Sequence, residues 1–265
     1  MNILCIGDIV GRPGRAAIER LLPGLKEEFH LDAVIANAEN SAGGSGITPR
    51  VAGQLFHLGC DVLTTGDHIW DKAEIREFLN QQETLLRPAN FPAGAPGKGW
   101  CLWEAAPGKK IGVINLLGRV FMRYNVNCPF REASALIEKL KKETPVIIVD
   151  MHAEATSEKI ALGFFLDGKV SALVGTHTHV QTADEKILPK GTAYITDLGM
   201  TGPQDSVIGQ NKEEIIQRFL SSLPHKFAVA MEGTELHGVL LDIDEATGSA
   251  RRIVRLQRRL EETVV

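Results

Sequence analysis

The chain has 265 residues, of which 44% are hydrophobic, and it carries 29 Lys and Arg against 33 Asp and Glu. This length and composition predict an α/β protein with a single domain over residues 1–265. The net charge of −4 argues against a protein that binds duplex nucleic acid by neutralising its phosphates. No apolar run reaches 18 residues, which excludes a transmembrane helix and a membrane partner.

The N-terminal segment and the cysteines together predict a cytoplasmic protein. Residues 2–6 form a short apolar run with no basic residues before it, which is typical of a strand rather than a signal peptide. No two of the four cysteines form a Cys-x-x-Cys pair, which favours reduced thiols. These cysteines are Cys5, Cys60, Cys101 and Cys128.

The first 80 residues alternate strand-like apolar runs with helical spacing, which predicts parallel strands joined by right-handed crossovers. The expected strands are residues 2–7, 32–36 and 61–65. The expected helices are residues 13–29, broken or kinked at Pro23, then 48–59, and a third that Asp71 and Glu74 cap and that ends near Leu79.

The remainder of the chain predicts further strands with helices at intervals. Residues 87–100 form a loop rich in Pro and Gly. Strands are expected at 101–105, 110–117, 146–150, 172–175 and 193–197, and helices at 131–142 and 156–166. The last 40 residues predict strands near 226–231, 235–243 and 250–260, with a hairpin turn at 245–248. This order of elements indicates two sheets with helices outside them.

Polar residues of the kinds that bind metals follow the carboxyl ends of five predicted strands. In open α/β sheets the ligand crevice lies at that edge, so these residues are expected to converge. The residues are Asp8, Glu39, Asn40, Asp67, His68, His152, His177 and His179.

Each cluster also has a simpler interpretation. Asp8 could cap the helix that follows it, Glu39 and Asn40 could belong to a polar loop, and Asp67 with His68 could form a turn. His177 and His179 give the sharpest local signal, because residues two apart in an extended chain point to the same side. Both imidazoles could then reach one metal site.

Three further residues could support the site without binding a metal themselves. Asp150 stands two residues before His152 and could orient its ring, and Asp197 could do the same or simply form a turn. Arg12 could contact a phosphate, although a solvated residue at a helix start is favoured slightly. Four histidines lack ligand-type neighbours and are interpreted as ordinary, namely His30, His57, His225 and His237.

Seven potential ligands are too many for one tetrahedral zinc site and suit two metal ions that share a carboxylate. The seven are Asp8, Glu39, Asn40, Asp67, His152, His177 and His179, with His68 left over. Pairs of metal ions serve in-line displacement at phosphorus. The nitrogen and oxygen ligand set, without thiolate, fits iron, manganese or zinc.

Several longer motifs make the sequence resemble the calcineurin-like metallophosphoesterases. More closely it resembles the bacterial YmdB family, which is described as 2′,3′-cyclic-nucleotide phosphodiesterases. The resemblance covers nearly the whole chain. The motifs that carry it are GDIVG at 7–11, NAEN at 37–40, RPANFP at 87–92, HAEATSEK at 152–159, GTHTHVQTAD at 175–184 and LPKGTAYITD at 188–197.

The resemblance implies a four-layer αββα sandwich of the calcineurin-like metallophosphoesterase type, with a two-metal site at the strand ends. One metal would take Asp8, Glu39, Asn40 and His179, and the other would take Glu39 as a bridge with Asp67, His152 and His177. Both ions would be iron or manganese, with zinc as an alternative. His68 would act as general acid while a metal-activated hydroxide attacks phosphorus.

The implied function is hydrolysis of 2′,3′-cyclic nucleotides such as 2′,3′-cyclic AMP, or of another small phosphoester. A broader phosphatase and a metal-containing regulatory protein with little turnover stay open, as does a homo-oligomer. A metal-dependent amidohydrolase is disfavoured, because its His-x-His comes early in the chain.

Two residues depart from the family pattern. Val10 stands where most of the superfamily has a histidine, and Asn40 is expected to fill that gap. Asp67 stands where the family has asparagine before His68, so an anionic oxygen replaces a neutral one.

Overall fold

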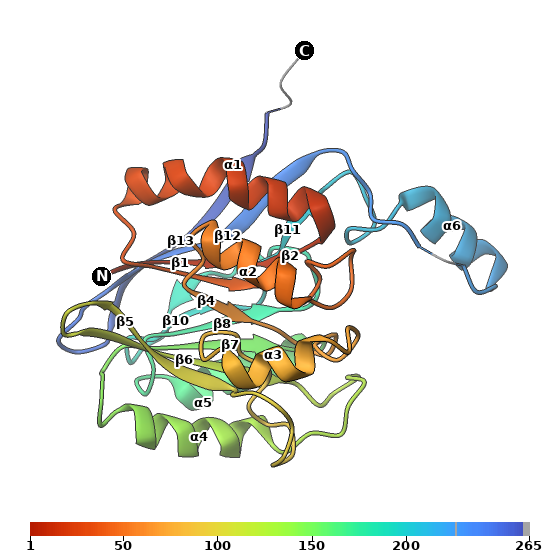
Figure 1. The fold of residues 1–265 in the computed structure, drawn as a ribbon. Helices are drawn as coiled ribbons and strands as arrows, with labels where there is room; N and C mark the ends of the chain where they lie inside the picture. The colour runs from red at the N-terminus through yellow and green to blue at the C-terminus, as the bar shows by residue number, and fades with distance from the viewer. Residues whose placement is uncertain (226, 262–265) are drawn as a thin grey trace.

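The computed structural model describes residues 1–225 and 227–261 and has a mixed α/β architecture with two sheets (Figure 1). The strands of the first sheet are β1 (Asn2–Ile6), β2 (Asp8–Ile9), β3 (Ala33–Asn37), β4 (Val62–Thr64), β11 (Met200–Pro203), β12 (Thr234–Ile243) and β13 (Ala250–Arg259). The strands of the second are β5 (Trp100–Ala106), β6 (Lys109–Leu117), β7 (Ile147–His152), β8 (Ala172–Thr176), β9 (Lys186–Ile187) and β10 (Ala193–Ile195). The helices are α1 (Gly11–Phe29), α2 (Pro49–His57), α3 (Ile75–Gln81), α4 (Pro129–Leu140), α5 (Thr156–Leu166) and α6 (Lys212–Ser221).

Both sheets have a parallel centre with antiparallel neighbours. In the first sheet β1, β3 and β4 are parallel, which confirms the expected β-α-β-α-β order, while β12 pairs antiparallel with β1 and β13. In the second sheet β6, β7, β8 and β10 run parallel, and β5 and β9 are antiparallel to their neighbours. The parallel strands therefore present their carboxyl ends at a common edge of each sheet.

Alternate residues of each strand pack in different apolar clusters. Ile3 and Cys5 of β1 share a buried cluster with Val113 of β6 and Ile148 of β7, so these faces of the two sheets meet. Leu4 and Ile6 of β1 instead pack with residues of α1 and α2. On the other side, α4 and α5 cover the second sheet (Figure 1). This alternation follows from the two-residue period of strands.

Local sequence signals explain where several elements begin. The Thr48 side chain accepts a hydrogen bond from the amide of Val51 and so caps α2, with Pro49 at its first position. The expected hairpin between β12 and β13 is present. There the Asp244 carboxylate accepts hydrogen bonds from the backbone amides of Ala246 and Thr247. Gly248, in the same turn, adopts a φ of 75°. That left-handed conformation favours glycine.

Some expectations about elements are wrong. α1 is not broken at Pro23, which lies inside the continuous helix. α3 begins at Ile75 instead of after Asp71, whose carboxylate accepts hydrogen bonds from Ser45 and Arg123. The strand expected at 226–231 is not formed by the described residues there: Val229 makes one isolated bridge with Gln210, and Lys226 lies outside the described residues.

α6, which the sequence pattern does not predict, projects from the rest of the molecule (Figure 1). Each cysteine is free, as expected. Among the described residues, no helix has both the length and the apolar character needed to cross a membrane.

Candidate metal centre

The strand ends bring all eight predicted site residues together. Asp8 belongs to β2, Glu39 and Asn40 follow β3, Asp67 and His68 follow β4, His152 ends β7, and His177 and His179 follow β8. Glu39 is fully buried, and Asp8 and His152 are also at 0% exposure. Buried ionisable groups this close to one another are rare in the absence of a ligand or a proton that compensates their charge.

Four residues form the tightest part of the site. One ligand atom from each of Glu39, Asp67, His152 and His177 lies within 4.8 Å of the other three. The Nε2 atom of His152 is 3.0 Å from Glu39 Oε1 and 3.3 Å from Asp67 Oδ1. The Nδ1 atom of His177 is 3.0 Å from His152 Nε2 and 3.5 Å from Asp67 Oδ1. Imidazole and carboxylate groups in this arrangement can hold a divalent metal ion.

Asp8, Asn40 and His179 form an adjoining group. His179 Nε2 lies 3.7 Å from Asp8 Oδ1 and 3.2 Å from Asn40 Nδ2, and Asn40 Nδ2 is 3.3 Å from Glu39 Oε1. Asp8 does not cap α1, because Val10 occupies the N-cap position of that helix. The Asn40 amide would have to rotate so that its oxygen faced a cation, since amide nitrogen is not a metal ligand.

His68 lies beside both groups and is the most exposed of the site histidines, at 33% of its side chain. Its Nδ1 atom is 3.0 Å from Asn40 Oδ1 and 3.3 Å from Glu39 Oε1, while its backbone amide donates to Glu39 Oε2. Its Nε2 atom is 3.9 Å from Asp67 Oδ2. The Nδ1 atom thus faces oxygens of the protein, whereas Nε2 makes no hydrogen bond with the described residues.

The two histidines after β8 do not lie on an extended chain, so that expectation is wrong. His177 has a φ of 101° and His179 a φ of 64°. These left-handed conformations are uncommon for residues other than glycine and cost free energy. The rings consequently diverge: His177 contacts His152 and Asp67, whereas His179 contacts Asp8 and Asn40.

Thr176 and Asn37 stand between Asp150 and His152, and each lies within hydrogen-bond distance of both side chains. The Thr176 hydroxyl donates to Asp150 Oδ1 at 2.7 Å and lies 2.9 Å from His152 Nδ1. Since that hydroxyl hydrogen is directed at Asp150, its oxygen accepts the Nδ1–H of His152. The arrangement leaves His152 Nε2 facing Glu39 and Asp67, the atom that would bind a metal. Asp197 makes no hydrogen bond to a histidine ring of the described residues; it accepts hydrogen bonds from Lys159, Thr178 and Gly199.

Mutual charge interactions set the protonation of the site. Burial raises the pKa of Asp8 to about 6, against the opposing charges of His179 and His152. Burial also disfavours ionised Glu39, but His152 and His68 outweigh it and hold the Glu39 pKa well below its ordinary value. Burial lowers the pKa of His68, yet hydrogen bonding and charge interaction with Glu39 outweigh it and raise that pKa to about 9. Burial and the His152 charge lower the pKa of His177 to about 4.

Two carboxylate oxygens indicate that the donor set fits metal ions. Asp8 Oδ1 and Asp67 Oδ1 are buried and accept no hydrogen bond from any residue that the structure describes. A buried anionic oxygen without a donor is costly unless a cation compensates it. One of these oxygens lies in each of the two groups around Glu39, so the residues present fit an ion in each group.

Comparison with models of protein families shows which family the chain belongs to. The model of the family described as YmdB-like protein matches residues 4–256. The chain belongs to the YmdB-like family. It is 51% identical over 97% of its length, and 96% of the relative, to a Bacillus subtilis protein named 2′,3′-cyclic-nucleotide 2′-phosphodiesterase.

Solved structures of other proteins share the fold of this family member. A Thermus thermophilus protein described as hypothetical matches with a TM-score of 0.91 at 39% identity, over 98% of this chain and 99% of that one. A Mycoplasma pneumoniae protein described as a novel phosphatase matches with a TM-score of 0.91 at 36% identity, over 98% of this chain and 93% of that one.

Sequence reasoning missed one residue of the site, Glu154. Its Oε2 atom lies 3.1 Å from His177 Nε2, which directs the Nδ1 atom of that ring at His152 and Asp67. Its place two residues after His152 was the available signal. Arg12 is exposed at the start of α1, and a phosphate contact there stays a prediction.

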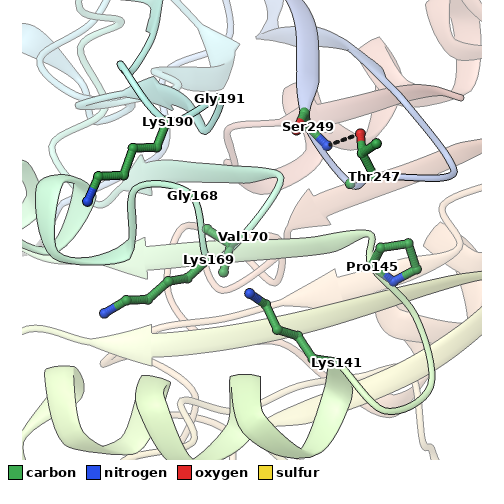
Figure 2. A pocket seen from close by; sticks show the side chains of 10 residues that line it. Lys141, Pro145, Gly168, Lys169, Val170, Lys190, Gly191, Thr247 and Ser249 are labelled. Atoms are coloured by element: carbon green, nitrogen blue, oxygen red, sulfur yellow. Dashed lines mark hydrogen bonds between the residues drawn. The ribbon is translucent and has the colours of Figure 1, made fainter.

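A separate pocket of about 220 Å³ is not part of this centre (Figure 2). Three lysines, Lys141, Lys169 and Lys190, line it together with the hairpin residues Thr247 and Ser249. It lies near the starts of β7, β8 and β10, away from the strand ends that carry the ligands. Its lining contains no carboxylate or imidazole, so it cannot complete the metal centre.

Proposed function

We propose that the protein is a metal-dependent phosphodiesterase that hydrolyses 2′,3′-cyclic nucleotides. The single observation that carries this proposal is a pair of buried carboxylate oxygens on either side of Glu39, Asp8 Oδ1 and Asp67 Oδ1, that accept no hydrogen bond from the described residues. Such a pair supports two cations that share one carboxylate. The name of the Bacillus subtilis relative supports the substrate class.

The proposed ligands divide between two ions. Asp8, Asn40 and His179 would hold one ion, Asp67, His152 and His177 would hold the other, and Glu39 would bridge them. When bound, two divalent ions of this kind supply an activated water and neutralise charge that develops on phosphorus. We propose iron or manganese, with zinc as an alternative, because the donors are nitrogen and oxygen.

The proton for the leaving group is assigned to His68. In metal-free protein, hydrogen bonding and charge from Glu39 raise the pKa of this imidazole to about 9 despite its burial. Glu39 Oε1 lies 3.3 Å from its Nδ1 atom, so Nε2 would donate to the ribose oxygen that leaves phosphorus. Partial exposure of this ring, at 33%, suits a group that meets a substrate.

We further propose a four-layer αββα sandwich in one domain over residues 1–265 of a cytoplasmic enzyme. Three apolar clusters support the layers, one between the sheets and one under each set of helices. The free cysteines agree with a reducing compartment. The proposed partner is a small phosphoester, and a homo-oligomer stays open.

Turnover of 2′,3′-cyclic AMP by wild-type protein and by His68→Ala tests the function. Loss of the general acid should slow hydrolysis by about 10²–10⁴-fold while both metals stay bound. A diester with a 4-nitrophenol leaving group should be much less sensitive, since that oxygen needs no proton.

Three results would contradict different parts of the proposal, namely the substrate, the catalytic activity and the role of His68. Metal-loaded wild type that hydrolyses monoesters but no cyclic nucleotide would make it a general phosphatase. Metal-loaded protein without turnover of any phosphoester would favour a regulatory protein. Loss of a metal ion in His68→Ala would make His68 a ligand.

A further inference from the structure

A buried ion pair lies directly behind the loop that carries His177 and His179. Lys159 of α5 and Asp197, which follows β10, are both at 0% exposure. The Nζ atom of Lys159 is 2.8 Å from Asp197 Oδ2. Neither residue contacts an imidazole ring, so the proposed reaction gives them no part.

The pair holds the peptide groups on both sides of His177. Lys159 Nζ donates to the carbonyl of Thr176 at 2.6 Å. Asp197 Oδ2 accepts hydrogen bonds from the backbone amide of Thr178 at 3.0 Å and from the Thr178 hydroxyl at 2.8 Å. Asp197 Oδ1 accepts the amide of Gly199 at 2.8 Å, so the carboxylate is itself fixed.

These two peptide groups determine the backbone dihedrals of His177. Its φ of 101° is strained for a residue with a side chain, and strain of this kind persists only where the surroundings enforce it. If the two peptide groups were released, the backbone would relax toward negative φ. The ring would then move away from His152 and Asp67, which it now faces.

The composition of the pair also indicates a role beyond stability. Apolar residues of similar volume often replace a buried ion pair with no loss of stability, so the pair alone is weak support for a stabilising role. The lysine here has a specific geometric task, because only a long donor on α5 reaches both the Thr176 carbonyl and Asp197.

We propose that Lys159 and Asp197 are a positioning pair that holds His177 in the conformation required to bind metal. The inference rests on the proposed two-metal site. It adds to that site a dependence on residues that touch neither metal nor substrate.

Manganese binding by the full chain tests the positioning role. Equilibrium dialysis of metal-free protein against Mn²⁺ counts the ions and gives their affinities. Wild type should bind two ions. Lys159→Met, which keeps the length of the side chain but cannot donate, should weaken one of them by about 10–100-fold, the usual cost of losing a group that orients a ligand.

A second variant keeps the test decisive if Lys159→Met does not fold. Lys159→Met combined with Asp197→Leu replaces both charges, leaves no buried charge unpaired, and should fold. It should show the same selective loss of one ion. The matched control is Leu162→Ala, one turn further along α5, fully buried and in the apolar cluster beneath the second sheet. This control should lose stability but bind both ions with wild-type affinity.

The outcomes separate the two proposals. Two ions bound at wild-type affinity by the double variant would overturn the positioning role and leave the function intact. Equal loss of affinity in Leu162→Ala at similar melting temperature would also overturn it, since general destabilisation would then explain the effect. Wild type that binds no Mn²⁺, Fe²⁺ or Zn²⁺ would instead overturn the proposed function.

Discussion

Glu39 is the residue on which the candidate centre depends most. Its Oε1 atom lies 3.0 Å from His152 and 3.3 Å from His68, and its Oε2 atom accepts the backbone amide of His68. Its Oε1 atom is also 3.3 Å from Asn40 Nδ2, so Glu39 faces side chains of both proposed metal groups. Its side chain is therefore the one placed to bridge two ions.

Replacement of Glu39 by glutamine should remove both ions rather than one. Glutamine keeps the size of the side chain but loses the charge and places an N–H group where a cation would bind. Metal analysis by mass spectrometry and turnover of 2′,3′-cyclic AMP measure the effect. Glu154→Gln is the matched control: the Glu154 carboxylate lies 3.1 Å from His177 Nε2, so this change should weaken one ion at most. Full stoichiometry and activity in Glu39→Gln would show that Glu39 is not the bridge.

Asp67 adds an anion to the proposed ligand set. With Asp8 and Glu39 it brings the formal charge of the proposed ligand carboxylates to −3 against +4 from two divalent ions. Its Oδ1 atom accepts no hydrogen bond from the described residues, so the charge is available to a metal. The extra anion should strengthen metal binding and weaken the metals as Lewis acids.

Asp67→Asn should therefore bind metal less tightly and still turn over substrate. Water held by more electron-poor ions ionises more readily, so the acid limb of the pH–rate profile should shift to lower pH. Profiles of both forms at saturating metal measure this shift. An unchanged acid limb would contradict the electrostatic argument, and a large gain in rate would indicate that Asp67 weakens this enzyme.

At the scale of elements, the turn after β4 passes so close to the second sheet that its residue must be glycine. A Cβ atom at Gly66 would lie 2.1 Å from His152 Cδ2 and 2.4 Å from Glu39 Oε2. Such distances are far inside van der Waals contact, and both atoms belong to well-packed site residues. The turn and the end of β7 therefore fix each other.

Gly66→Ala should displace His152 and Glu39 and so lower metal affinity and activity together. Dialysis against Mn²⁺ and the melting temperature measure the two effects. Gly53→Ala in α2 is the control, because a Cβ there meets nothing within 4 Å. It should stabilise the protein by about 0.5–1 kcal/mol, as alanine does in a helix, and leave the metals unchanged. Normal metal binding by Gly66→Ala would contradict the tight packing described.

At the scale of the whole molecule, the site couples the protonation of His68 to folding. The charge of Glu39 raises the pKa of His68 from 6.5 to about 9 against the effect of burial. The folded protein then binds a proton that the unfolded chain releases between these pH values. In metal-free protein this stabilisation is complete below about pH 6.5 and is lost as the pH rises toward about 9.

The melting temperature of metal-free protein should accordingly fall between pH 6.5 and about 9. Thermal unfolding in the presence of a chelator measures it for wild type and His68→Ala. The variant should show a shallower fall, though some slope should persist because Glu39 also raises the pKa of the fully buried His152 despite the opposing effect of burial. Parallel curves for the two proteins would show that His68 is not coupled to folding.

The pattern of polar residues after apolar runs was sufficient to predict which side chains lie together, because strand order and handedness bring parallel strand ends to one edge. Apolar periodicity likewise predicted β1, β3, β4 and most of the second sheet. It missed α6, whose apolar side chains Phe219 and Leu220 are 80% and 76% exposed and so form no buried face. It also placed a strand near Val229, where the described residues contribute a single bridge.

The sequence by itself determined which residues would meet and which chemistry they could support, since side-chain type and strand order are written in it. Only the tertiary structure decided how His177 and His179 are aimed, that Thr176 stands between Asp150 and His152, and that Lys159 reaches Asp197. Those features depend on dihedral angles and contacts between segments far apart in the chain. Local propensity does not encode them, because packing across two sheets enforces conformations that an isolated segment would avoid.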